Sequence, residues 1–349
     1  MKLLSHFRKY VSSPYPILTN FPHLTIDAQY KIQYNFDIST TFHRTVNHLH
    51  ETSSDNQKKE KLPTLIILHG TGGGIDAARW HGLGLSQYSC HSQDQRPYQI
   101  LSISRPGYLS SQPTCNSFSQ EAYILDQMCQ HLNLEQVAIM AVSGSGPTAL
   151  TFVRDYPKRA NGKYQKKIIS FYVSYSGLIL MDAISKRPSF NLFKAWITSN
   201  IIGRNITSNL ISYLWHENWR PEQLVRFGFS GWDTVQEIRS DKSVDHLFRE
   251  HFLRTFTWGG SRRLGLRSET RRLKYDLNEQ PNWTVHVPVL YLYGGKDQLV
   301  TDEHVQHVMN NVVHGVPKQV ARFSESTHVL PLKQSSILVN EFLSKYVFL

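Results

Sequence analysis

Ser143, Asp297 and His328 have the side chains that nucleophilic acyl transfer requires, and each follows a segment that we expect to be a strand. A serine hydroxyl is a weak nucleophile at neutral pH, so it needs a base within hydrogen-bond reach and a third group that orients this base. Imidazole and carboxylate groups fill these two roles. The sequence therefore predicts Ser143 as nucleophile, His328 as base and Asp297 as the partner of His328.

Ser143 follows the apolar segment Val137–Val142 and begins the small-residue run Ser143-Gly-Ser-Gly-Pro. This pattern predicts a strand that turns sharply into a helix and displays the serine hydroxyl at the turn. Ala141 and Ser145 supply the small residues that such a turn needs on either side, although the strict motif has glycine there. With Ser145 as nucleophile, Pro147 would occupy a crowded position, so we select Ser143. A tight strand-to-helix turn without catalytic function is the structural alternative.

The carboxylate and the imidazole are expected on loops directly after strands. Val287–Tyr293 predicts a strand that ends before Asp297, and Gln319–Phe323 predicts another that ends before His328. A terminal helix is expected from Gln334. The chain order of the three groups is therefore Ser, Asp, His.

Two nearby alternatives are weighed against this choice. Asp302 is a second carboxylate, but Thr301 and Glu303 around it indicate the capped start of a helix, so Asp297 is preferred. His304 and His307 could share one face of that helix, and we expect them to be solvated. No metal site is predicted.

Upstream, the predicted strand Leu65–Leu68 ends in His69-Gly-Thr-Gly-Gly-Gly74, a loop that can turn backbone amides toward a reacting carbonyl. Leu24–Ile38 alternates apolar and polar residues and predicts one half-buried strand at the edge of the sheet. Ser117 and Gln120 form a capping-box pattern for a helix. A helix over Thr148–Asp155 is expected to stop at Tyr156-Pro157.

The other expected elements complete one fold class. Ala122, Leu125, Cys129 and Leu132 recur at helical spacing after the capping box, and Ile168–Tyr175 predicts a further strand. Strands that alternate with helices predict an α/β fold, with a mostly parallel sheet and helices on both faces.

The order Ser, Asp, His, the turn at Ser143 and the His-Gly loop resemble the α/β-hydrolase superfamily over residues 60 to 349. Leu101-Ser-Ile-Ser-Arg-Pro-Gly-Tyr108 is similar to the strand and loop that precede the helix before the nucleophile in this family. The resemblance implies that residues 1–177 and 285–349 form the hydrolase core. It implies that residues 178–284, which hold six of the seven tryptophans, form an inserted helical cap.

The resemblance also implies a mechanism. The amides of Thr71 and Gly144 would form the oxyanion hole, and no cofactor would be needed. A serine nucleophile, where epoxide hydrolases and haloalkane dehalogenases of the superfamily have an aspartate, implies acyl chemistry. We expect a small, partly apolar acyl substrate, and ester, amide, thioester, lactone and carbon-carbon bonds all stay open.

The net charge of +11 comes partly from two basic groups. The first surrounds residues 154–167, and the second contains Arg254, Arg262, Arg263, Arg267, Arg271, Arg272 and Lys274. Neither contains a recognisable nucleic-acid module, so no nucleic-acid partner is predicted. We interpret both groups as solvated surface, with an anionic surface partner as the alternative.

The sequence also indicates where the protein is located. No apolar run approaches the ~20 residues of a membrane span, and the N-terminus lacks the apolar core of a signal peptide, so a cytoplasmic protein is expected.

Two other functions are alternatives to a hydrolase. Gly72, Gly74 and Ala77 fit a dinucleotide-binding pattern, and Arg105 could bind a 2′-phosphate, which would indicate an NADP-binding oxidoreductase. A ligand receptor on a hydrolase scaffold is the other alternative. The oligomeric state is not predicted.

Overall fold

A sheet of eight strands in the order β1-β2-β4-β3-β5-β6-β7-β8 forms the centre of the molecule. The computed structural model describes residues 23–26, 30–38, 62–88, 98–159, 168–175, 220–226, 230–252, 259–275 and 284–346. The strands are β1 (His23–Ile26), β2 (Tyr30–Ile38), β3 (Thr64–Leu68), β4 (Gln99–Ile103), β5 (Gln136–Val142), β6 (Ile168–Tyr175), β7 (Val289–Gly294) and β8 (Lys318–Phe323). β1 pairs with β2 and β2 with β4 in antiparallel fashion, and the pairs from β4 to β8 are parallel.

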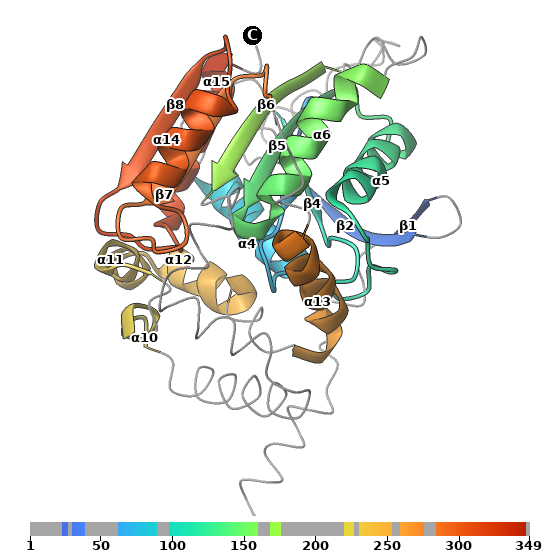
Figure 1. Cartoon of the computed structure of the whole chain (residues 1–349). Helices are drawn as coiled ribbons and strands as arrows, with labels where there is room; N and C mark the ends of the chain where they lie inside the picture. Colours follow the sequence, from blue (N-terminus) through green and yellow to red (C-terminus); the bar gives the residue numbers. More distant parts are fainter. Residues whose placement is uncertain are drawn as a thin grey trace, which may run out of the picture.

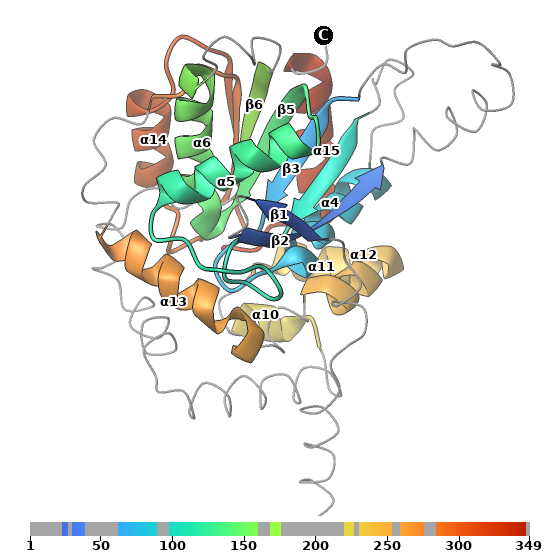
Figure 2. The same cartoon turned by 90° about the vertical axis from the view of Figure 1, so that its right-hand side faces the viewer.

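Helices cover both faces of this sheet, as Figure 2 shows with the sheet between two layers. One layer holds α5 (Phe118–His131), α6 (Gly146–Arg159) and α14 (Asp302–Asn311), and the other holds α4 (Ile75–Gln87) and α15 (Leu332–Tyr346). Every residue of β3 is buried, as expected for a continuous apolar strand covered on both faces. The α/β-hydrolase type of architecture predicted from the sequence is confirmed.

Further helices lie across the end of the sheet to which the strand arrows of β5, β6 and β7 point (Figure 1). They are α10 (Glu222–Arg226), α11 (Trp232–Ser240), α12 (Lys242–Leu247) and α13 (Gly259–Tyr275). Ile238 and Leu247 of this group pack with Trp80 of α4 and Leu332 of α15 in one buried cluster. All four helices fall within residues 178–284, and the domain division itself stays a prediction.

Several expected boundaries are confirmed and two are wrong. The side chain of Ser117 accepts a hydrogen bond from the Gln120 amide at 3.1 Å at the start of α5, as expected from the capping box. The single edge strand predicted over residues 24–38 is two strands, β1 and β2, because alternation identifies the buried face and does not reveal where a chain reverses. The helix α6 continues through Pro157 to Arg159, so this proline affects only the last turn.

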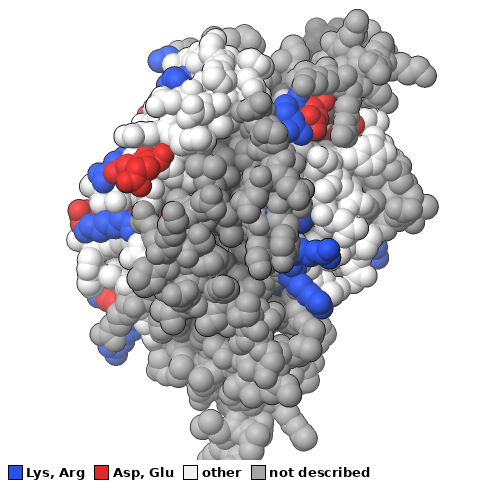
Figure 3. Space-filling view, viewed as in Figure 1, with Lys and Arg blue, Asp and Glu red and all other residues white. Residues whose placement is uncertain are grey.

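The second basic group does not form one surface. Arg262 and Arg272 are buried, and they pair with Asp76 and Glu121 respectively. Arg267 and Arg271 of the same helix are exposed, and Figure 3 shows basic side chains over the region that α13 occupies in Figure 1. An anionic partner for the exposed part stays a prediction.

Among the residues that the structure describes, none belongs to a helix long and apolar enough to cross a membrane.

The ion pair between Arg262 of α13 and Asp76 of α4 provides a stability test. Both side chains are 3% exposed, and their closest atoms are 2.5 Å apart. Arg262→Met should lower the free energy of unfolding by about 3–5 kcal/mol, because it leaves a buried carboxylate without its partner. Arg249→Met is the matched control, since Arg249 forms a half-exposed pair with Asp245, and its loss should cost less than about 1 kcal/mol. Urea denaturation measures both, and equal small losses would contradict the prediction.

Candidate active site

A strained turn presents the hydroxyl of Ser143. β5 ends at Val142, a single 3-10 turn covers Ser143–Ser145, and α6 begins at Gly146. Ser143 has a φ of 50°, in the left-handed region that residues other than glycine rarely adopt. Such strain concentrates at functional sites, where the surrounding structure holds it in place. The strand-turn-helix geometry expected at this serine is therefore present.

Ser145 belongs to the frame of this turn. It is fully buried, and its hydroxyl oxygen lies 3.0 Å from the carbonyl oxygen of Leu68 and 2.9 Å from that of Val142. The Val142 amide donates a hydrogen bond to the same hydroxyl at 2.8 Å. Ser145 thus ties the end of β5 to the neighbouring strand β3, and only the hydroxyl of Ser143 faces the other candidate site residues.

The structure brings Ser143, His328 and Asp297 into one hydrogen-bonded line. His328 Nε2 is 2.7 Å from Ser143 Oγ, and His328 Nδ1 is 2.8 Å from Asp297 Oδ2. A carboxylate only accepts hydrogen bonds, so Nδ1 carries the proton and Nε2 is free to accept the proton of the serine hydroxyl. The other oxygen of Asp297 accepts a hydrogen bond from the Leu299 amide at 2.7 Å, which fixes the carboxylate.

The charge of Asp297 and the burial of the ring shift the pKa of His328 in opposite directions. Burial of the ring would lower its pKa, but the Asp297 carboxylate raises it more through its charge and its hydrogen bond. The net result is a pKa above the ordinary value of 6.5. At pH values above this raised pKa the ring is neutral and can accept a proton.

The loop after β3 lies against the nucleophile turn. A Cβ atom on Gly144 would come within 2.0 Å of Thr71 Oγ1, so nothing larger than hydrogen fits between these two residues. The ring of His69 supports the loop from behind, with Nδ1 2.8 Å from the Gly70 carbonyl oxygen and Nε2 3.0 Å from the Arg105 amide. Burial and the charge of Arg105 hold the pKa of His69 well below its usual value, so its ring is neutral.

The helix α11 holds the loop that carries His328. Ser230 and Thr234 donate hydrogen bonds to the carbonyl oxygen of Val329, at 2.9 Å and 3.2 Å. The Ser326 hydroxyl also bonds to the carboxylate of Asp233. The residue after His328 is therefore fixed by side chains from residues 178–284, which the sequence patterns did not identify.

Glu237 extends this support to the start of α15. Its carboxylate accepts hydrogen bonds from the amides of Lys333 at 3.0 Å and Gln334 at 3.3 Å. The first amides of a helix have no partner within the helix, so this carboxylate from α11 caps α15 directly after the His328 loop.

The competing candidates are placed elsewhere. Asp302 is exposed at the start of α14, where it bonds to the Tyr293 hydroxyl at 2.6 Å and to Arg322 at 3.1 Å. His304 is buried, so its expected solvation is wrong: the inner face of α14 packs it against the core, whereas His307 is exposed. Arg105 is 1% exposed and bonded to carboxylates, so its guanidinium is not accessible to the 2′-phosphate of NADP.

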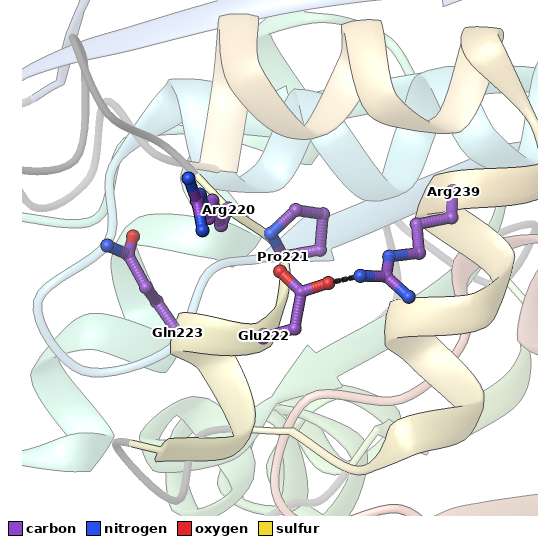
Figure 4. Close-up of a pocket in the computed structure, with 5 residues that line it drawn as sticks. All are labelled: Arg220, Pro221, Glu222, Gln223 and Arg239. Carbon is purple, nitrogen blue, oxygen red and sulfur yellow. Dashed lines mark ion pairs between the residues drawn. The ribbon is translucent and has the colours of Figure 1, made fainter.

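A cavity of about 560 Å³ lies away from this line of three groups. Among the described residues, its lining consists of Arg220, Pro221, Glu222, Gln223 and Arg239, and it includes none of Ser143, Asp297 and His328. Figure 4 shows Glu222 of α10 and Arg239 of α11 pointing toward one another across it as an ion pair. Its five described lining residues include no serine, cysteine or histidine.

Part of the chain matches known hydrolases in sequence. Residues 63–162 match the family model described as alpha/beta hydrolase fold. An uncharacterised hydrolase from Bacillus subtilis, YcgS, is 32% identical over 98 residues, which cover 28% of this chain and 31% of that protein. The chain thus matches about a third of the length of this curated relative.

Solved structures share the fold over nearly the whole chain. An alpha/beta hydrolase fold protein from Nakamurella multipartita has a TM-score of 0.63 at 13% identity, covering 94% of this chain and 99% of that one. An enol-lactonase from Burkholderia xenovorans has a TM-score of 0.54 at 12% identity, covering 93% and 100%. The juvenile hormone epoxide hydrolase of the silkworm Bombyx mori has a TM-score of 0.58 at 14% identity, covering 98% and 81%.

The close approach between α11 and the His328 loop can be tested at Gly231. A Cβ atom there would come within 1.7 Å of the Glu325 carbonyl oxygen, so Gly231→Ala must displace the loop or the helix. We expect a loss of about 1–3 kcal/mol in the free energy of unfolding, as for other overpacked sites. Ser240→Ala is the control on the same helix, because the one bond of the Ser240 hydroxyl to a described residue stays within α11, to the Glu237 carbonyl oxygen. Similar urea midpoints for the two variants would show that the contact is dispensable.

Proposed function

We propose that this chain is a serine hydrolase that cleaves an ester or related acyl bond of a small, partly apolar substrate. Its α/β-hydrolase fold and the match of residues 63–162 to the alpha/beta hydrolase fold model support this proposal. The observation that carries this proposal is the unbroken hydrogen-bonded line from Asp297 through His328 to Ser143. A strained backbone displays the serine hydroxyl at one end of this line, and the carboxylate at the other end is 6% exposed.

In the proposed mechanism, Ser143 Oγ bonds to the acyl carbon while its proton passes to His328 Nε2. The resulting tetrahedral intermediate collapses, the acyl bond breaks, and His328 returns the proton to the leaving group. A water molecule then attacks the acyl-enzyme and gives one proton to His328. The bond between the acyl carbon and Ser143 Oγ breaks, His328 returns this proton to Ser143 Oγ, and the acid product leaves. Asp297 holds the ring so that Nε2 faces the serine throughout, and it stabilises the imidazolium.

The negative charge that develops on the carbonyl oxygen needs nearby donors. We assign this role to the backbone amides of Thr71 and Gly144, which lie on two segments in direct contact. Each donor of this kind contributes on the order of a hundredfold to a thousandfold in rate.

The helices of residues 178–284 are proposed to act as the cap over this site. They lie at the carboxyl edge of the sheet, where ligands bind in open α/β folds, and α11 supports the loop of His328. Of the six tryptophans in this segment, Trp232 is described, and at 51% exposure it lies at the surface. The other tryptophans of this segment lie outside the described residues.

The cytoplasmic location stays a prediction.

A ligand receptor that keeps the hydrolase scaffold is the second candidate, favoured only by the fold itself. Labelling with a fluorophosphonate separates the two, because this reagent reacts with an activated serine. A hydrolase should be labelled at Ser143, and a scaffold whose serine is not activated should not be.

Substitution of Ser143 should affect turnover, whereas substitution of Ser145 should affect the free energy of unfolding. Ser143→Ala should abolish nearly all turnover of short and medium p-nitrophenyl esters while the protein stays folded. Ser145→Ala should keep most of the turnover but lower the free energy of unfolding by about 1–3 kcal/mol, since it leaves buried partners of its hydroxyl unpaired. Initial rates and urea denaturation measure both effects. Full activity in a folded Ser143→Ala variant would remove the assignment.

The pH dependence of kcat/KM should report on His328. The ring accepts a proton only when neutral, so activity should rise with pH through the pKa of His328, which lies above 6.5 in the native protein. In Asp297→Asn the charge that raises this pKa is gone. The midpoint should therefore move to lower pH, and kcat should fall by about 10³–10⁴-fold because the ring is no longer held in the required tautomer. An unchanged midpoint would argue against this pairing.

A further inference from the structure

The helix α13 carries a carboxylate to the nucleophile turn. Glu269 is fully buried, and its Oε1 atom lies 2.7 Å from the position that a Cβ atom on Gly144 would occupy. Thr71 Oγ1 lies 2.0 Å from the same position. The residues that carry both proposed oxyanion donors and the carboxylate from α13 therefore meet at one point.

Arg105 and Tyr108 hold this carboxylate in place. Arg105 Nη1 donates a hydrogen bond to Glu269 Oε1 at 2.7 Å, and the Tyr108 hydroxyl donates one to Oε2. Burial alone would lower the pKa of Arg105, but the carboxylates of Glu121 and Glu269 raise it well above its usual value. The guanidinium is therefore charged, and it offsets the negative charge beside Gly144.

The same arginine also holds the loop that carries Thr71. Its Nη1 atom is 3.2 Å from the His69 carbonyl oxygen, and its backbone amide donates to His69 Nε2 at 3.0 Å. Glu121 of α5 fixes the guanidinium from the other side, with Oε1 2.5 Å from Nε. One side chain thus joins the His69 loop on one side of the site to Glu269 on the other.

We propose that Glu269 is a positioning residue of the oxyanion hole, whose carboxylate, held by Arg105 and Tyr108, sets the separation of the Thr71 and Gly144 amides. The two donors lie on separate segments, and catalytic groups need to be held within about 0.5 Å of their productive positions. Glu269 contacts one segment directly and reaches the other through Arg105. This inference rests on the proposed serine-hydrolase function.

Two substitutions with a matched control test it. Glu269→Gln keeps the size of the side chain but weakens its bond to Arg105, and Tyr108→Phe removes only the hydroxyl that bonds to Oε2. Ser268→Ala is the control, because Ser268 is the neighbour of Glu269 on α13 and its hydroxyl bonds to the Cys115 carbonyl oxygen at 2.5 Å instead of to Arg105 or Tyr108. The values of kcat and KM are measured for each on the p-nitrophenyl ester that the wild type turns over fastest, with thermal unfolding followed by circular dichroism.

Misplaced oxyanion donors weaken binding of the transition state more than binding of the substrate. Glu269→Gln should therefore lower kcat by about tenfold or more with KM changed by less than about threefold. Tyr108→Phe should change kcat in the same direction by less, and Ser268→Ala should leave both constants within about twofold of the wild type. A structural role alone would instead lower thermal stability and leave kcat of the folded protein unchanged.

The outcomes separate this inference from the proposed function. A wild type that neither turns over esters nor reacts with a fluorophosphonate overturns the function, and the inference falls with it. An active wild type with kcat unchanged in Glu269→Gln overturns only the inference. A higher kcat in that variant also overturns it, since the charge of Glu269 would then oppose catalysis more than its position supports it. If Glu269→Gln does not fold, Tyr108→Phe decides by the same criteria.

Discussion

The buried guanidinium of Arg105 is the constraint around which the functional end of this molecule is arranged. A charged group that is 1% exposed persists only where carboxylates and carbonyl oxygens compensate for the lost water. Here those groups come from α5, from α13 and from the loop after β3. Satisfying one side chain therefore fixes the relative positions of three segments. Such networks contribute less to net stability than to the uniqueness of the geometry, which is what a site with sub-ångström tolerances requires.

The parallel sheet supplies the second constraint, because it places the ends of β3, β5, β7 and β8 at one edge. Each of these strands is followed by one part of the candidate site: the His69 loop, Ser143, Asp297 and His328. The strands set the spacing along the edge, and local hydrogen bonds set the directions of the side chains. Ser230 and Thr234, at the start of α11, bond to the loop that carries His328. The positions of the base and of the oxyanion segments therefore both depend on helices outside the sheet.

The elements that local patterns determine were predictable from the sequence. The buried strand before Ser143, the small residues around it and the capping box at Ser117 all depend on neighbours within a few positions, and each agrees with the structure. The restriction of Ser145 to a structural role followed from the crowding of the turn. By contrast, Glu269 and Glu237 lie in a helical segment without any motif, and their importance comes from contacts with residues about 100 to 160 positions away. Arg262 and Arg272 looked like surface charge because charge runs usually are, and only the fold reveals their partners.

The contacts described above also constrain how the molecule can be assembled. Ser143 and His328 are 185 positions apart, Arg105 and Glu269 are 164 apart, and Asp76 and Arg262 are 186 apart. A chain emerging from the ribosome therefore completes β3, β4, β5 and their helices, with Glu121 already beside Arg105, long before Glu269 and Arg262 are synthesised. During that interval a folded N-terminal half would hold charges that lack their native partners. Closure of the site thus has to wait for the last third of the polypeptide, which supplies Glu269, Asp297 and His328.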